Sequence, residues 1–113
     1  MSSRFEHLPR RVVGGGGGRP APPGGLEVPI ATGFRARLLG LTLLDRADAG
    51  PGLLIPRCAA VHTYGMRFAL DVCFLGAHDE VLGVRRAVPP RRFVARRGAA
   101  AVLEVPALSE IPA

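Results

Sequence analysis

The pattern of apolar and polar residues is most informative between Val61 and Leu75, where it predicts the central extended region of the chain. From Phe68 onward the side chains alternate between two faces, and both faces are apolar except for one carboxylate, Asp71. A strand that is apolar on both faces is normally buried. A buried carboxylate must be hydrogen-bonded, paired or protonated, because it otherwise destabilises the fold by several kcal/mol. Asp71 therefore predicts a polar site inside a sheet, and Gly65 predicts an interruption or a bulge before it.

Short apolar runs separated by glycine and proline predict further strands on either side of this region. Strands are expected over residues 26–30, 53–55, 81–84 and 99–105, with an extended loop over residues 87–92. The polar connection at residues 76–80 predicts a hairpin between the central region and the strand that follows it. Thr32 is expected to cap one short helix, in which apolar residues recur at helical spacing up to Leu41.

These elements predict a mainly β fold, either a small antiparallel barrel or a jelly-roll-like sandwich with one short helix. We assign this fold to residues 26–113 as a single domain, which is long enough for one modest core. Residues 1–25 contain five consecutive glycines and a proline-rich stretch, a composition that buries too little apolar area to fold. We predict that they form a disordered tail. Their glycines do not predict a nucleotide-binding loop, because no Lys-Ser/Thr follows them.

The chain is strongly basic, but its composition argues against a nucleic-acid-binding surface. The formal net charge is +6 and all 15 basic residues are arginine, whereas there is no tryptophan and only one tyrosine. Grooves that bind single strands combine positive charge with aromatic stacking residues. The arginine pairs at residues 10–11, 85–86, 91–92 and 96–97 are therefore predicted to be solvated surface. Nucleic acid is not the expected partner.

The two cysteines, Cys58 and Cys73, lie within apolar segments and are predicted to be free core thiols. No stretch has the pattern of a signal peptide, and no apolar run approaches the roughly 20 residues of a membrane span. The sequence therefore predicts a cytoplasmic protein without a membrane partner.

Candidate chemistry gathers around the central region. Cys58, His62, Asp71 and Cys73 come closest to a zinc-binding set, but the paired arms of structural zinc sites are missing. We therefore predict no metal or other cofactor, with zinc as the less favoured alternative. An enzyme would use His62 as a base, Cys58 or Thr63 as the nucleophile and Asp71 to orient the imidazole. The favoured interpretation is structural: His62 and Asp71 hydrogen-bond each other or the backbone and hold a bulge.

Arginines close to Asp71 in the sequence suggest another alternative. If a neighbouring strand placed Arg57 or Arg67 opposite Asp71, the pair would form a pocket for an anion or a carboxylate. The simpler interpretation is a salt bridge at the rim, worth under about 1 kcal/mol.

Residues 31–107 resemble a known family, domain of unknown function family 192. The resemblance rests on Phe34–Leu41, Gly52–Ile55, Cys58–Leu75, Val88–Arg91 and Val102–Ala107, which follow in the family's order. It implies a compact, mainly antiparallel β fold with a small helix, in bacterial and archaeal proteins, and no established enzyme activity. The family's signature carries over, position by position, to Arg37, Gly40, Leu41, His62, Met66, Asp71 and Glu104. It assigns chemistry to none of them.

The chain departs from the family pattern at two places. Leu44 stands where relatives often have a basic residue, and the chain stops soon after Glu104, where relatives usually continue into another strand. A missing strand would leave a C-terminal edge unpaired. Such an edge predicts reduced stability or self-association.

The sequence as a whole predicts a non-catalytic or accessory module that binds an unidentified small ligand or protein. The predicted site is a polar cluster of His62, Asp71 and Glu104, with Arg37 or Arg67. Too few titratable groups surround it for a self-evident reaction. The alternative is a small hydrolase or metal-assisted enzyme that uses His62, Asp71 and Cys58.

Overall fold

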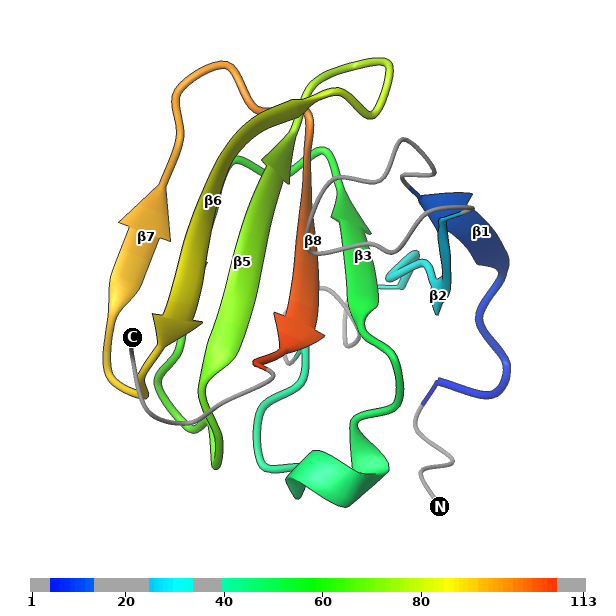
Figure 1. Ribbon diagram of the computed structural model, residues 1–113. Helices are drawn as coiled ribbons and strands as arrows, with labels where there is room; N and C mark the ends of the chain where they lie inside the picture. The colour runs from blue at the N-terminus through cyan, green and yellow to red at the C-terminus, as the bar shows by residue number, and fades with distance from the viewer. Residues whose placement is uncertain (1–4, 14–24, 34–39, 108–113) are drawn as a thin grey trace.

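In the computed structural model, residues 5–13, 25–33 and 40–107 are described. They form eight strands and one short 3-10 helix (Figure 1): β1 Arg10–Val13, β2 Leu26–Pro29, η1 Arg46–Asp48, β3 Leu53–Pro56, β4 Ala60–His62, β5 Leu70–Leu75, β6 Val81–Val88, β7 Phe93–Ala95 and β8 Ala101–Pro106. The strands are arranged as an open four-stranded sheet, in the order β3-β8-β5-β6, and two ribbons, β1-β2 and β4-β7. All pairs of strands are antiparallel. The predicted mainly β class is therefore confirmed.

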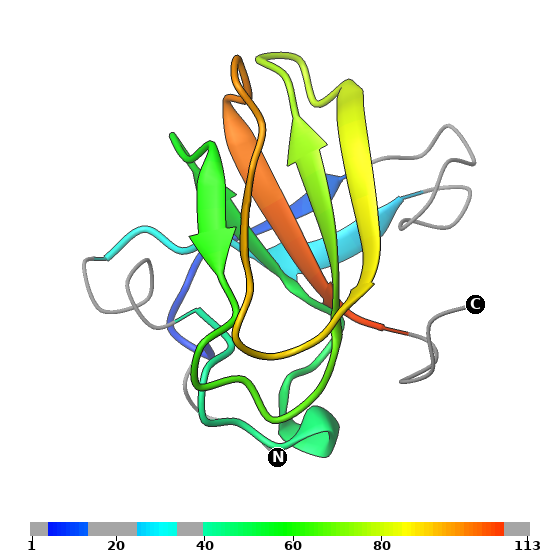
Figure 2. The ribbon, with the colours of Figure 1, turned by 90° about the vertical axis from the view of Figure 1, so that its left-hand side faces the viewer.

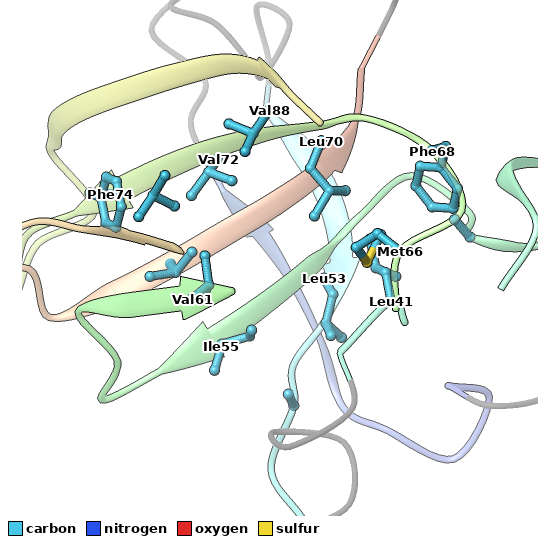
Figure 3. Close-up of a cluster of buried hydrophobic side chains, with 14 of the residues drawn as sticks. Leu41, Leu53, Ile55, Val61, Met66, Phe68, Leu70, Val72, Phe74 and Val88 are labelled. Atoms are coloured by element: carbon cyan, nitrogen blue, oxygen red, sulfur yellow. The ribbon is translucent and has the colours of Figure 1, made fainter. Parts of the chain in front are cut away.

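The four-stranded sheet separates two cores, because side chains alternate along each of its strands. On β5, Leu70, Val72 and Phe74 belong to the larger core, whereas Cys73 and Leu75 belong to the smaller one. The β4-β7 ribbon packs on the larger core, part of which Figure 3 shows in close-up. The β1-β2 ribbon packs on the smaller core and crosses the sheet steeply in Figure 2. Both faces of β5 are thus covered, as its apolar pattern predicted.

Most of the predicted strands are present, with bounds shifted by a few residues. The central region divides into β4 and β5, which lie in different sheets, and the break falls at the predicted glycine. Gly65 has a φ of +84°, and its carbonyl accepts a hydrogen bond from the N–H of Leu43 at 2.9 Å. The expected loop at residues 87–92 is partly wrong, because β6 continues to Val88 and ends where prolines begin.

The predicted short helix falls mainly on residues 34–39, which lie outside the described residues. The helical element within the described ranges is η1, which follows Asp45 as a single turn. No helix in these ranges has the length and apolar character needed to cross a membrane.

Residues 5–13 require a correction to the predicted disordered tail. β1 pairs along its full length with β2, from Arg10 opposite Pro29 to Val13 opposite Leu26. Phe5 and Leu8 are buried in the larger core, and Val13 is buried in the smaller one. These few apolar side chains supply burial that the glycine-rich composition of the whole segment concealed. Residues 1–4 and 14–24, also assigned to the tail, lie outside the described residues.

The last described strand, β8, does not itself form the unpaired C-terminal edge that the sequence predicts. It lies between β3 and β5 and pairs with both. The edges of the sheet are β3 and β6. Part of the β3 edge is covered, because the N–H of Ala31 donates to the carbonyl of Leu54 at 2.8 Å. Self-association therefore stays a prediction, and the sheet edges available for it among the described residues are β3 and β6.

Candidate functional site

A partly open cavity of about 170 Å³ lies on the larger-core side of the four-stranded sheet. We call it the Glu104 cavity. Its walls come from β3, β4, β8 and the turns beside them: Gly40, Leu41, Thr42, Ile55, Cys58, Ala60, Val61, His62, Met66 and Glu104. An apolar wall with a few polar groups is typical of small-molecule sites. A cavity of similar size, about 150 Å³, holds benzene, so this one suits a ligand of roughly six to eight heavy atoms.

Glu104 occupies a core position because it continues the alternation of β8. Val102 and Glu104 point to one face of the sheet, and Leu103 points to the other. The Glu104 side chain is buried, with 4% of its surface exposed. Within the part of the chain that the structure describes, its Oε1 atom has no hydrogen-bond partner. Glu104 is therefore a buried acceptor with unused capacity, and it lies in the wall of a cavity.

Burial raises the pKa of Glu104 to about 7, because desolvation penalises the charged form. A hydrogen bond with the backbone of Leu41 lowers the pKa and so opposes this effect. Near neutral pH both protonation states of Glu104 are populated. The side chain can then accept a hydrogen bond as a carboxylate or donate one as a carboxylic acid.

Two glycines allow the backbone to approach Glu104 closely. Gly40 has a φ of +52°, and a Cβ atom there would lie 3.0 Å from the Oε1 atom of Glu104. Gly52 has a φ of +148°, and a Cβ atom there would lie 2.6 Å from the backbone oxygen of Glu104. Both conformations favour glycine, since only glycine adopts them without a steric penalty.

His62, Cys58 and Thr63, the predicted base and nucleophiles, are held by local hydrogen bonds. The Nδ1 atom of His62 accepts from the N–H of Tyr64 at 3.2 Å, and the thiol of Cys58 donates to the carbonyl of Ala60 at 3.1 Å. The buried hydroxyl of Thr63 donates to the carbonyl of Pro89 at 2.7 Å and accepts from the N–H of Arg92 at 2.8 Å. Thr63 thus anchors the loop after β6.

Asp71 is buried, as predicted, but on the face of the sheet opposite Glu104. In the register of β5 and β8, Asp71 pairs with Val105 and the next residue, Val72, pairs with Glu104. The Oδ1 atom of Asp71 accepts a hydrogen bond from the N–H of Ala87 at 2.8 Å. Ala87 lies in a bulge of β6 and has a φ of +49°. Asp71 thus contacts the backbone of a bulge in the neighbouring strand, which is the arrangement that the structural interpretation predicts.

The structure does not assemble the single polar cluster that the sequence predicted. His62 and Glu104 line the same cavity, whereas the side chain of Asp71 lies on the opposite face of the sheet. That position also keeps Asp71 out of a triad with His62. Arg67 is exposed and pairs with Asp45 at 3.1 Å, as a salt bridge at the rim. Arg37 lies outside the described residues.

The zinc-binding set is likewise divided. Cys58 packs against the larger core with His62 nearby in the cavity wall, but Cys73 belongs to the smaller core with Asp71 on its face. Among the described residues, no three His, Cys, Asp or Glu side chains are grouped so that they could hold a metal ion. Both cysteines are free. Burial raises the pKa of Cys73 to about 11, which makes its thiol a poor nucleophile.

The arginine pairs at residues 10–11, 85–86, 91–92 and 96–97 are all exposed, as predicted. Arg10 forms a salt bridge with Glu27 at 3.2 Å, and Arg11 pairs with Asp79. These contacts tie the surface of the β1-β2 ribbon together and to the β5-β6 hairpin. They lie away from the lining of the Glu104 cavity.

Several residues of the cavity wall were named from the sequence, but it was not predicted that they line one cavity. Glu104 entered the prediction through the family resemblance, although its own strand carried a signal. One acidic residue in register with apolar neighbours is the pattern that identified Asp71. The contributions of Leu41, Cys58 and Met66 have no such signal, because loops bring them to the cavity.

Comparisons with known proteins support the fold and the family. A UPF0127 protein from Thermococcus sibiricus is 32% identical over 84 residues, which cover 71% of this chain and 54% of the relative. The chain thus spans about half the length of that relative. Residues 20–109 match the family model DUF192, described as an uncharacterised ACR.

Two crystal structures share the fold at low sequence identity. A protein of unknown function from Novosphingobium aromaticivorans aligns with a TM-score of 0.64 at 19% identity, covering 96% of this chain and 81% of that one. A protein described as a candidate transcription regulator from Sinorhizobium meliloti aligns with a TM-score of 0.67 at 21% identity, covering 87% and 78%.

Proposed function

This chain belongs to the DUF192 family, and we propose that it is a non-catalytic module that binds a small ligand in the Glu104 cavity. The observation that carries the proposal is the buried Oε1 atom of Glu104, which has no hydrogen-bond partner among the described residues. An unsatisfied buried polar atom destabilises a fold by about 1–3 kcal/mol. A ligand that donates a hydrogen bond to this atom would remove that penalty.

The rest of the cavity supports binding rather than catalysis. Its apolar walls offer burial for the body of a ligand, and Glu104 offers one directional contact. His62 and Cys58 also line the cavity, which keeps a small hydrolase as the alternative. That alternative is weaker, because His62 accepts a hydrogen bond from Tyr64 and the orienting carboxylate that it needs, Asp71, lies on the opposite face.

The test is a fragment screen on the full chain, with compounds of up to about eight heavy atoms followed by chemical-shift changes and calorimetry. We expect binders whose affinity falls at least tenfold in Glu104→Gln. Asp71→Asn is the matched control, since it neutralises a carboxylate that is equally buried on the other face. It should leave the affinity unchanged.

Two results would contradict the proposal. One is the absence of any fragment that binds the unmodified chain. The other is turnover of a small ester or amide that Cys58→Ser abolishes, which would favour the hydrolase.

We further propose that the module works in the cytoplasm. Cys58 and Cys73 are free thiols in different cores, and unpaired thiols are typical of reducing compartments. Cell fractionation with an epitope-tagged chain tests this location. Recovery of the tagged chain in an extracytoplasmic fraction would overturn it.

A further inference from the structure

The charge around the Glu104 cavity indicates what kind of head group fits it. Its titratable lining residues, among those that the structure describes, are Glu104, His62 and Cys58, and none of the described lining residues is an arginine although the chain contains 15. The described part of the lining therefore provides a buried acidic group without a basic side chain that is permanently charged. A ligand with a negative charge would be repelled by Glu104 when it is ionised. A ligand with a positive charge would supply the counter-charge that the lining lacks.

Hydrogen bonding narrows this choice to a compact cation. The backbone of Leu41 already hydrogen-bonds with the Glu104 side chain, so the Oε1 atom, which has no partner within the described ranges, is the acceptor that remains. A hydrogen bond from a charged donor is roughly twice as strong as one from a neutral donor. A guanidinium brings five donors in a rigid plane, whereas an ammonium group is small and brings three. One free acceptor beside a partly open cavity suits the ammonium group better, because its other donors can face water.

The walls determine the rest of the ligand. Leu41, Ile55, Val61 and Met66 give an apolar lining, and methionine adapts readily to the shape of a straight chain. The volume of about 170 Å³ limits the ligand to about six to eight heavy atoms. An aliphatic stem of about four to six carbons with a terminal nitrogen satisfies both limits.

We propose that the Glu104 cavity binds a primary ammonium group on a short unbranched aliphatic stem, with the ammonium donating to the Oε1 atom of Glu104. This inference rests on the proposed function and specifies its ligand class. The ammonium comes from either a free alkylamine or a lysine side chain of another protein. A second copy of this chain cannot supply the lysine, because the sequence contains none.

Calorimetric titration of the full chain with hexylamine, hexanol and hexanoate at pH 8 tests the proposal, since these probes share one stem. We expect hexylamine to bind at least tenfold more tightly than hexanol, and hexanoate not to bind. In Glu104→Gln, hexylamine should lose at least tenfold in affinity and become equal to hexanol. Gly40→Ala is a second variant, because a methyl group 3.0 Å from the Oε1 atom would obstruct the ammonium.

A pH series separates charge from shape. Hexylamine stays protonated from pH 5 to pH 8, because an alkylamine has a pKa near that of lysine, about 10.4, whereas Glu104 ionises across this range. Its affinity should rise at least tenfold between these limits, and hexanol should show no such rise. His62 and Cys58 are the other titratable groups in the lining. The rise should persist in His62→Gln and in Cys58→Ser, and should disappear in Glu104→Gln.

Several outcomes would overturn the ammonium assignment. If hexanol binds as tightly as hexylamine, the cavity still binds a small ligand, but the head group is not a cation. If hexylamine binds only after Arg37→Gln removes that guanidinium, the carboxylate of Glu104 is already paired with Arg37 in the unmodified chain. If neither the probes nor the wider fragment screen yields a binder, the proposed function itself fails. Titration with N-acetyl-lysine methylamide identifies the source: equal affinity indicates a lysine side chain, and binding of hexylamine alone indicates a free amine.

Discussion

Asp71 and Glu104 lie on neighbouring strands, one register position apart, and each is 4% exposed. They differ in what surrounds them. Asp71 faces the smaller core and accepts the N–H of Ala87 in a bulge, whereas Glu104 faces the larger core and has an oxygen without a partner among the described residues. Burial alone therefore does not identify a functional carboxylate. The hydrogen bonds that remain available distinguish a structural group from a binding group.

Removal of the Asp71 carboxylate should give the largest change in stability of the tests that compare these two carboxylates. Asp71→Ala leaves the buried N–H of Ala87 without its acceptor and releases the bulge of β6. We expect the free energy of unfolding to fall by about 3 kcal/mol, as measured by urea denaturation. Asp71→Asn keeps an acceptor oxygen and should lose less. A loss below about 1 kcal/mol in Asp71→Ala would mean that the bulge does not depend on this contact.

The pH dependence of stability should give the next largest effect. The pKa of Glu104 is raised from 4.5 in the unfolded chain to about 7 in the fold, so the folded state binds more protons between these values. Stability therefore falls as the pH rises from 5 to 8, by about 2 kcal/mol from this group. Urea denaturation across this range should show a smaller fall in Glu104→Gln.

That variant also provides the control. At pH 8, Glu104→Gln should be more stable than the unmodified chain, because no charge is buried. The Asp71→Asn variant should not show this gain at pH 8. Equal pH profiles for Glu104→Gln and the unmodified chain would show that Glu104 titrates in the fold as it does when unfolded.

Two glycines provide a smaller and better matched test. Gly40 and Gly50 have φ values of +52° and +69°, but a Cβ atom at Gly50 would contact nothing within 4 Å. Each change to alanine should lower stability by about 1 kcal/mol through backbone strain. Only Gly40→Ala should also weaken binding in the Glu104 cavity, as measured by calorimetry. Equal binding by both variants would place the ligand away from Glu104.

Cysteine labelling compares the two cores without changing the sequence, and it should give the smallest effect of these tests. Cys58 lines the cavity and is partly exposed, whereas Cys73 is buried and its pKa is raised to about 11. Iodoacetamide should therefore modify one thiol per folded chain, and mass spectrometry of peptides should locate it at Cys58. A bound ligand should slow the reaction. Modification of Cys73 at a similar rate would show that the smaller core opens readily.

The strands and the buried carboxylate of Asp71 were predictable because both follow from the local alternation of side chains along the sequence. The period of two across residues 68–75 determines which side chains share a face, and one acidic residue stands out against it. The bulge that satisfies Asp71 was not predictable, because it depends on one extra residue in β6. Nor could residues 5–13 be placed, since their burial requires β2 and the larger core.

The candidate site was predicted less completely than the fold. His62 and Glu104 were both named. Their separation from Asp71 depends on the register of β8 against β5, which determines which side chains share a face of the sheet. The family resemblance named residues without placing them on these faces. The cavity itself forms where β3, β4 and β8 contact the turn at residues 40–42. Contacts between segments so far apart in the sequence give little signal in a local pattern.

The central place of β8 also has a consequence for how the protein is made. β3 and β5 are synthesised well before β8, yet each pairs with it. The middle of the sheet thus stays open on the ribosome until residues 101–106 have emerged. The hairpin β5-β6 can form early because its contacts are local. β3 can join the sheet only through β8, which follows it by about 50 residues in the chain. Nascent chains stalled before this point would present two incomplete edges, and these are what a chaperone would have to shield.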